Sequence, residues 1–221
     1  MWYDVLERLD LQQYTAHLLD FRGSGRSDRP ADGHDLDGYA SDLRAAIETI
    51  GVPVTIVAHS MGAKVTQYVA VSSPPLLQRL ILVAPGTARG VRPDERHRAL
   101  AVAAFGSRDR IRAFVRAAMS REISEQAMER LVIDALVGQR EAWFGWYDRG
   151  RTVDFSDLLG AIAVPTYILA AEGDPLAPPA RVRREVAAAI PGAVFVLLHG
   201  IGHNIAVESP ENVATLISRV A

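Results

Sequence analysis

The chain has 221 residues, of which 49% are hydrophobic, and its formal net charge is −2. This length and apolar content suffice for one sizeable buried core, and a balanced charge without a basic stripe argues against a nucleic-acid partner. The absence of cysteine excludes disulfides, thiolate metal ligands and a cysteine nucleophile.

The first residues predict a short helix over Met1–Leu11, with acidic residues among them. Acids so close to the start are not typical of a signal peptide. No apolar stretch approaches the roughly 20 residues that a membrane-spanning helix needs. We therefore expect a soluble cytoplasmic protein with no membrane partner.

Five short, mostly apolar runs predict the strands of a parallel sheet that is covered on both faces. These runs are Tyr14–Leu19, Val54–Ala58, Leu80–Ala84, Thr166–Ala171 and Val194–Leu198. The helical patterns between and after them are Leu36–Ile50, Met61–Val71, Pro179–Ile190 and Pro210–Val220. This alternation predicts an α/β fold with a doubly wound sheet.

The region between the third and fourth predicted strands contains no convincing strand. Its four helical patterns are Pro93–Phe105, Arg108–Met119, Ser124–Leu136 and Gln139–Tyr147. We therefore expect residues 85–163 to form a helical insertion, with residues 1–84 and 164–221 making up the core domain. The alternative is an ordinary helical excursion whose apolar residues pack on one another.

The most informative segment is Ala58-His59-Ser60-Met61-Gly62, which lies between a predicted strand and a predicted helix. A serine between small residues at such a junction is typical of a sharp turn that presents its hydroxyl at the edge of a sheet. Ser60 is therefore the candidate nucleophile. The alternative is that Ser60 only caps the helix that follows.

A serine hydroxyl becomes a good nucleophile only when a base takes its proton and a carboxylate orients that base. Asp174 and His203 each follow a predicted strand, at the carboxyl ends where open α/β sheets keep their sites. Glu172 and His199 are the competing acid and base, but each lies nearer to the end of its strand.

Two further blocks extend the pattern: Asp20-Phe21-Arg22-Gly23-Ser24-Gly25-Arg26-Ser27, and Gly202-His203 followed by Glu208-Ser209-Pro210-Glu211. With the serine motif and the order Ser60, Asp174, His203, the chain resembles the α/β-hydrolase superfamily, particularly its capped serine esterases and haloperoxidase-like members. The resemblance implies a mostly parallel sheet flanked by helices, with the insertion as a helical cap. It also implies that the Met61 backbone N–H stabilises the oxyanion.

The resemblance also implies parts that the chain lacks. Relatives have about three strands before the Asp20 loop, and a His-Gly loop that supplies a second oxyanion N–H. No His-Gly pair precedes Trp2, so we expect an N-terminally truncated hydrolase fold. The alternatives are a decayed copy and a rearranged sheet in which the Tyr14–Leu19 and Val54–Ala58 strands pair directly.

Other residues are candidates for secondary roles. His59 flanks the nucleophile and is expected to line the substrate pocket. Trp143 and Trp146 share a face of the last insertion helix, which is expected either to line the same pocket or to pack in the core of the insertion. Asp20 and Arg22 are expected to form a structural ion pair or to clamp their loop. His17, His34 and His97 lie in no motif and are interpreted as solvent-exposed or packing residues.

These features predict a serine hydrolase that cleaves a small, fairly apolar ester through an acyl-enzyme on Ser60, with no cofactor and no metal. A ligand-binding or catalytically impaired relative is the alternative, and a lyase or a carbon–carbon bond hydrolase would use the same three residues. An open strand edge would also favour assembly of a homo-oligomer.

Overall fold

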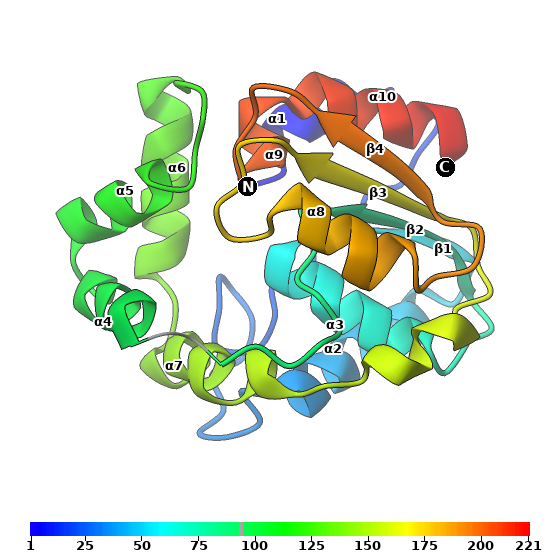
Figure 1. Ribbon diagram of the computed structural model, residues 1–221, viewed down its shortest axis with the longest axis horizontal. Coiled ribbons are helices and arrows are strands. Elements are labelled where there is room, and N and C mark those ends of the chain that lie inside the picture. The colour runs from blue at the N-terminus through cyan, green and yellow to red at the C-terminus, as the bar shows by residue number, and fades with distance from the viewer. Residues whose placement is uncertain (93–94) are drawn as a thin grey trace.

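A parallel sheet forms the centre of the molecule (Figure 1). The computed structural model describes residues 1–92 and 95–221. Within these residues the sheet has four strands in the order β1-β2-β3-β4, and each neighbouring pair is parallel. The strands are β1 (Val54–His59), β2 (Leu77–Val83), β3 (Thr166–Ala171) and β4 (Val194–Leu198). All their carboxyl ends therefore meet at one edge of the sheet.

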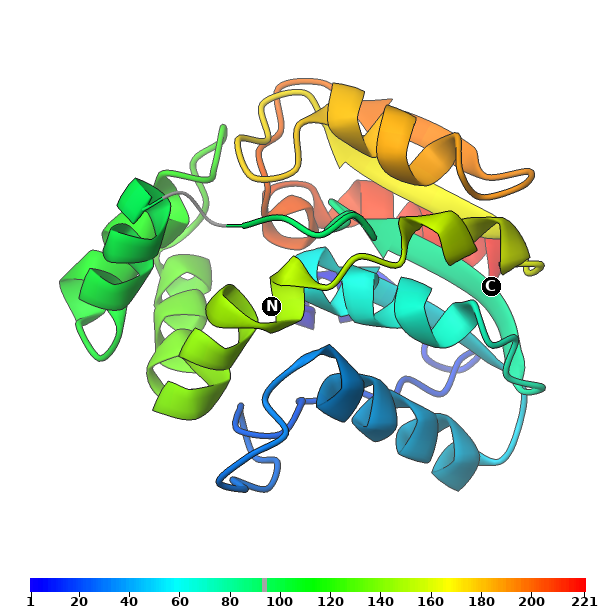
Figure 2. The ribbon, with the colours of Figure 1, turned by 60° about the horizontal axis from the view of Figure 1, so that its bottom comes forward.

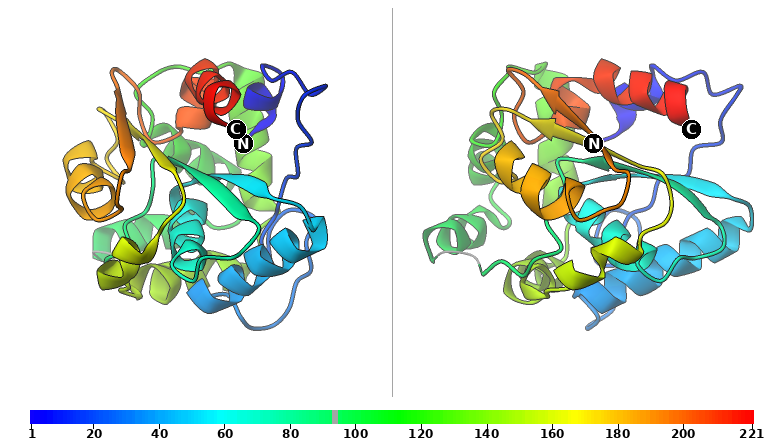
Figure 3. Two further views of the ribbon diagram at one scale, coloured as in Figure 1. Left: turned by 90° about the vertical axis from the view of Figure 1, so that its right-hand side faces the viewer. Right: turned by 45° about the vertical axis from the view of Figure 1, so that its right-hand side comes forward.

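Helices cover both faces of the sheet (Figures 1 and 3). One face packs against α2 (Leu36–Ile50), α3 (Ser60–Ala70) and α8 (Pro179–Val182), which runs on into a π-helical turn over Arg183–Ala187. The other face packs against α1 (Tyr3–Leu6), α9 (Ile205–Glu208) and α10 (Pro210–Val220). The first helix is shorter than the predicted Met1–Leu11. None of the described helices is both long enough and apolar enough to cross a bilayer.

The two apolar cores follow from the alternation of side chains along each strand. On β2, Leu80 and Leu82 belong to the core shared with α2, α3 and α8. Their neighbours Ile81 and Val83 belong to the core shared with α1 and α10. A strand buried on both faces reads as a continuous apolar run, which is why the sequence predicted a strand here. β2 nevertheless begins three residues before the predicted start at Leu80 and ends one residue before Ala84.

The ends of α2 lie where its sequence predicts them. Asp35 caps the helix, and its side chain accepts a hydrogen bond from the backbone N–H of Gly38. Gly51 ends the helix in a left-handed conformation with φ of 69°, which costs a glycine little.

The predicted strand over Tyr14–Leu19 is wrong: this segment is irregular and pairs with no strand in the described structure. Residues 15–20 are exposed, and the side chain of Leu18 is 56% exposed. A run of apolar residues forms a strand only where a partner satisfies its backbone groups. The direct pairing of this segment with β1 is therefore contradicted, and β1 is an edge strand.

Residues between β2 and β3 form helices beside the sheet, as Figure 2 shows. The four α-helices are α4 (Glu95–Ala104), α5 (Arg108–Arg116), α6 (Glu125–Leu136) and α7 (Arg140–Asp148). Two 3₁₀ helices follow, over Gly150–Thr152 and Ser156–Ala161. The predicted start of the first helix at Pro93 lies outside the described residues, as does the side chain of His97.

The helices α4–α6 share a small apolar cluster of their own, formed by Ala104, Ile111, Met128 and Val132. Ion pairs tie α6 to the N-terminal segment, because Arg130 lies 2.6 Å from Asp4 and Asp134 lies 3.1 Å from the terminal ammonium. A helical layer with its own cluster therefore stands beside the carboxyl edge of the sheet.

Candidate active site

Ser60 lies at the junction of β1 and α3, where the chain turns sharply from strand to helix. Its φ of +50° lies in the left-handed region, which a residue with a side chain seldom adopts. Such strain costs of the order of 1–3 kcal/mol and persists only where the surroundings impose it. Packing of β1 and α3 in the same core supplies that constraint.

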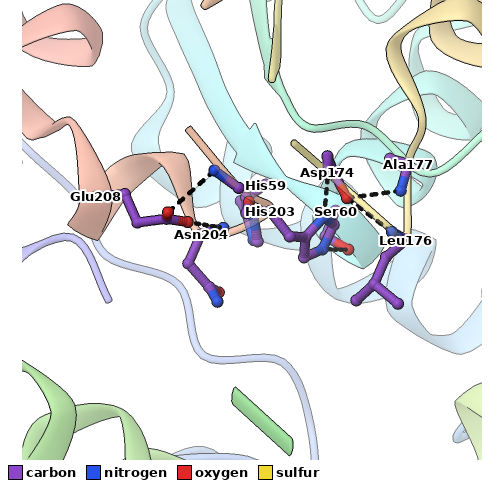
Figure 4. A network of polar contacts seen from close by, with 9 residues as sticks. His59, Ser60, Asp174, Leu176, Ala177, His203, Asn204 and Glu208 are labelled. Carbon is purple, nitrogen blue, oxygen red and sulfur yellow. Dashed lines mark hydrogen bonds and ion pairs between the residues drawn. The ribbon is translucent and has the colours of Figure 1, made fainter. Parts of the chain in front are cut away.

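Three side chains from distant parts of the chain meet at this edge of the sheet (Figure 4). The Nε2 atom of His203 lies 2.9 Å from the hydroxyl oxygen of Ser60. Its Nδ1 atom lies 2.8 Å from Oδ2 of Asp174. This network assigns the proton to Nδ1, so that Nδ1 donates to the carboxylate and Nε2 accepts from the serine.

The Asp174 carboxylate is held in place on both of its oxygens. Its Oδ1 atom accepts hydrogen bonds from the backbone N–H groups of Leu176 and Ala177, each at 2.8 Å. Asp174 is only 4% exposed, and this desolvation acts to raise its pKa. The hydrogen bonds and the charge of His203 outweigh desolvation and leave the pKa of Asp174 below its usual value. The acid is therefore ionised and fixed.

The competing acid and base, Glu172 and His199, lie together on the surface. The His199 Nδ1 atom is 3.3 Å from the Glu172 carboxylate, and both side chains are largely exposed. A hydrogen bond from the Gly200 N–H and the neighbouring His199 lower the pKa of Glu172. Neither side chain takes part in the Ser60 network.

His59 does not line the cavity beside Ser60, in contrast to the role expected from its position. Its Nε2–H donates to the backbone carbonyl of His203 at 2.8 Å, and its ring lies 4.8 Å from the ring of His203. Burial, followed by the charge of His203, lowers the pKa of His59 to about 3. A neutral His59 thus supports the loop that carries His203.

Glu208 has a role that the sequence did not suggest, although it belongs to the block after His203. Its buried carboxylate accepts hydrogen bonds from Gly202 (3.0 Å) and Asn204 (3.1 Å), which flank His203 (Figure 4). It also accepts from the N–H groups of Ser120 (2.7 Å) and Arg121 (2.9 Å), in the loop after α5. Glu208 therefore joins the histidine loop to the α4–α7 region.

Met61 occupies the second position of α3, so its backbone N–H belongs to the first helical turn. The first N–H groups of a helix have no intrahelical acceptor and favour negative charge nearby. Met61 also lines the cavity beside Ser60. Both facts suit the oxyanion role that the resemblance assigns to this N–H.

A cavity of about 120 Å³ opens beside Ser60 and His203. Its other lining residues are Met61, Lys64, Pro85, Gly86, Thr87, Val91, Trp146, Tyr147, Arg151, Leu176, Ala177 and Arg181. Trp146 thus lies at the cavity, and its contact with substrate stays a prediction. Trp143 does not line it, because its indole N–H donates to the carbonyl of Ala101 in α4 and its ring packs on the apolar cluster of the insertion.

Lys64 lies one turn after Ser60 in α3 and is only 2% exposed. Its ammonium donates to the backbone carbonyls of Val153 (2.7 Å) and Arg151 (3.0 Å), and more weakly to that of Arg89 (3.5 Å). Burial lowers the pKa of Lys64 to about 8, against the attraction of Asp154. The sequence offered no sign of this role, which depends on carbonyls far along the chain.

The Asp20 block holds an ion pair, but its partner differs from the expected one. Arg22 pairs with Asp42 of α2 at 2.6 Å, and not with Asp20. Asp20 instead accepts from the backbone N–H of Arg26, across a loop in which Gly23 and Gly25 have positive φ. Among the described residues, no group of three or more His, Cys, Asp or Glu side chains is arranged to hold a metal ion.

Several known proteins are similar to this chain in sequence or fold. A non-heme chloroperoxidase from Streptomyces lividans is 26% identical over 218 residues, which cover 90% of this chain and 78% of the relative. A bifunctional esterase/perhydrolase from Acinetobacter calcoaceticus is 49% identical over 53 residues, or 23% of this chain and 19% of the relative.

The fold is similar to that of a solved bromoperoxidase from Bacillus anthracis, with a TM-score of 0.85 and 17% identity. That match covers 99% of this chain and 85% of the other. The model of the alpha/beta hydrolase family matches residues 1–216, which is nearly the whole chain. The chain therefore belongs to the alpha/beta hydrolase family, and it is a hydrolase-like enzyme of that family.

Proposed function

We propose that this protein is a serine hydrolase that cleaves small esters through an acyl-enzyme on Ser60. The observation that carries the proposal is the relay from the Ser60 hydroxyl through His203 to Asp174, with distances of 2.9 Å and 2.8 Å. These distances lie within the range that proton transfer requires. The family membership agrees with hydrolysis in general.

The relay suits acyl transfer to water. His203 takes the proton of Ser60 as the serine oxygen attacks the ester carbonyl, and then passes that proton to the departing alcohol. Asp174 keeps the imidazole in the required tautomer and stabilises its charged form. The negative oxygen of the intermediate lies against the Met61 N–H. Water then attacks the acyl-enzyme with His203 again as the base, which releases the acid and regenerates Ser60.

The α4–α7 region acts in this proposal as a cap over the nucleophile. Its last helix supplies Trp146 and Tyr147 to the cavity, and the following turn supplies Arg151. A closed cavity excludes water other than the reacting molecule and strengthens the electrostatic interactions inside. The volume of about 120 Å³ is below the roughly 150 Å³ of a cavity that holds benzene, which favours a small acyl group.

The test is the time course of p-nitrophenol release from p-nitrophenyl acetate. An acyl-enzyme predicts a burst that is stoichiometric with the protein, followed by steady turnover. The Ser60→Ala variant removes both phases, whereas Ser73→Ala, which changes a serine between α3 and β2, leaves both in place. Turnover that survives in Ser60→Ala would contradict the proposal. A burst without turnover would indicate a ligand-binding or impaired relative.

Perhydrolysis is a second candidate for the same site, because one relative is named a bifunctional esterase/perhydrolase. Hydrogen peroxide would attack the acyl-enzyme in place of water, which gives a peracid and the free serine. Peracid formed from hydrogen peroxide and ethyl acetate by the wild type, but not by Ser60→Ala, would support this activity. Ester turnover without any peracid would leave simple hydrolysis.

A further inference from the structure

The cavity beside Ser60 carries positive charge on several of its sides. Lys64 comes from α3, Arg151 from the turn after α7, and Arg181 from α8. None of the described lining residues is an aspartate or a glutamate. The sequence favoured a fairly apolar substrate, but three cations around so small a space favour a different one.

Arg181 is the cation with the clearest freedom to bind a ligand. Glu185 lies four residues after Arg181 on the same helical segment. Its carboxylate forms an ion pair with Arg184 at 2.7 Å and not with Arg181. Within residues 1–92 and 95–221, no carboxylate forms an ion pair with Arg181. Arg181 lines the cavity, and this residue is partly exposed.

Two carboxylates, Asp174 and Asp154, offset part of this positive charge, but neither lines the cavity. Asp174 is committed to His203 and to two backbone N–H groups, and its side chain has no exposed surface. The Asp154 carboxylate accepts from the N–H and hydroxyl of Ser156. Lys64 is held by carbonyls, so it contributes charge rather than direct contact. The Arg151 guanidinium lies 5.7 Å from the centre of the Tyr147 ring.

We propose that the substrate is an ester whose short acyl chain ends in a carboxylate, which Arg181 binds while Ser60 attacks the ester carbonyl. A planar guanidinium binds a carboxylate through two parallel charge-assisted hydrogen bonds. The reaction consumes one water and releases an alcohol and a short dicarboxylic acid. This inference rests on the proposed serine hydrolase activity and names its substrate class.

The experiment compares p-nitrophenyl hydrogen glutarate with p-nitrophenyl valerate, which have acyl chains of the same length with and without a terminal carboxylate. Rates are corrected for spontaneous hydrolysis. The wild type is expected to prefer the glutarate ester by about ten-fold or more in kcat/KM, the usual scale for a charge-assisted contact. Added salt is expected to reduce the preference.

Variants locate the preference on one side chain. Arg181→Met is expected to bring the ratio of kcat/KM for the glutarate and valerate esters close to one. Arg181→Lys is expected to retain part of the wild-type ratio, because lysine keeps the positive charge but lacks the two parallel N–H donors of the guanidinium. Arg184→Met is the matched control on the same segment, because Arg184 is exposed and does not line the cavity. That control keeps the wild-type ratio.

Binding separates this inference from the proposed activity. Calorimetry with Ser60→Ala measures the affinity for glutarate against that for neutral valeramide, and then repeats the measurement with Arg181→Met added. Glutarate binding that depends on Arg181 supports the anion site even where no ester is cleaved. Equal cleavage of both esters, or glutarate binding that Arg181→Met leaves unchanged, overturns the inference and leaves the hydrolase activity standing.

Discussion

The carboxyl edge of the sheet and the free side of β1 differ in the burial and hydrogen bonding of their residues. At the carboxyl edge, Asp174 and His203 are 4% and 5% exposed, and each is held by several hydrogen bonds. Along the free side of the sheet, the segment over residues 15–20 is exposed and forms no strand. Burial with satisfied polar groups, and not apolar composition alone, is what makes a segment ordered and specific.

The largest effect is expected at the acid of the relay. Asp174→Asn should lower kcat roughly 10³- to 10⁴-fold, because an amide does not hold the tautomer of His203 that accepts the serine proton. Glu172→Gln is the control, since Glu172 pairs with His199 on the surface, and we expect it to change kcat less than two-fold. Steady-state rates with p-nitrophenyl acetate measure both. An equal loss of kcat in the two variants would contradict the assignment of Asp174, rather than Glu172, as the acid that orients His203.

The pKa of Lys64 tests whether water is excluded from the carboxyl edge of the sheet. Its pKa is lowered from 10.5 to about 8, so between these two values the unfolded chain binds more protons than the folded one. The contribution of Lys64 to the free energy of unfolding should therefore rise with pH across that window, by about 3 kcal/mol in total. Urea unfolding between pH 7.5 and 9.5 measures the part of this rise that precedes ionisation of Tyr39 and Tyr147, whose pKa values burial raises to about 12, and Lys64→Met should abolish it.

The same titration is directly visible, because Lys64 is the only lysine of the chain. Protein labelled with ¹³C-lysine gives one set of side-chain signals, whose shift against pH reports this pKa alone. A midpoint near 8 is expected. A midpoint at or above 10 would show that the ammonium is hydrated and that this part of the edge is open to water.

Glu208→Gln should have a moderate effect on both stability and rate. The new amide points an NH₂ group at backbone N–H donors that the carboxylate now accepts, which should cost about 2 kcal/mol of unfolding free energy. Displacement of the His203 loop should also lower kcat by about ten-fold. Glu48→Gln on α2 is a matched exposed control. Full activity in Glu208→Gln would show that the hydrogen bonds of the Glu208 carboxylate do not position His203.

The smallest effect is expected on the free side of β1. Leu18→Gln should change the free energy of unfolding by less than about 0.5 kcal/mol, because the side chain is already exposed. Leu82→Ala, in the fully buried part of β2, should cost about 2–5 kcal/mol. Chemical denaturation compares them. A large loss in Leu18→Gln would mean that the segment packs against something in solution.

The sequence predicted the four paired strands and most helix ends because those features depend on near neighbours. Asp35 and Gly51 mark the ends of α2 through local hydrogen bonds and local backbone angles. That Ser60, Asp174 and His203 would meet was predictable for a related reason: each follows a strand, and parallel strands bring such positions to one edge. Their catalytic roles stay predictions.

Most of the errors concern long-range partners. Tyr14–Leu19 has the composition of a strand but no neighbour to pair with. Trp143 and Trp146 lie three residues apart on α7, and only the packing of α7 on α4 decides which of them reaches the cavity. Arg22 pairs with Asp42 of α2 rather than with Asp20, two residues before it. Lys64 donates to backbone carbonyls more than twenty residues away, and two of the N–H groups that donate to the Glu208 carboxylate also lie more than twenty residues from it.

The most direct test of the account is labelling with a fluorophosphonate, followed by mass spectrometry of the digested protein. A relay through His203 predicts one adduct, on the peptide that contains Ser60, in the wild type and in His199→Ala at similar rates. It predicts that His203→Ala slows this labelling at least a hundred-fold, because the serine then has no base. Labelling elsewhere, or equal labelling of Ser60 in wild type and His203→Ala, would contradict a relay that runs through His203.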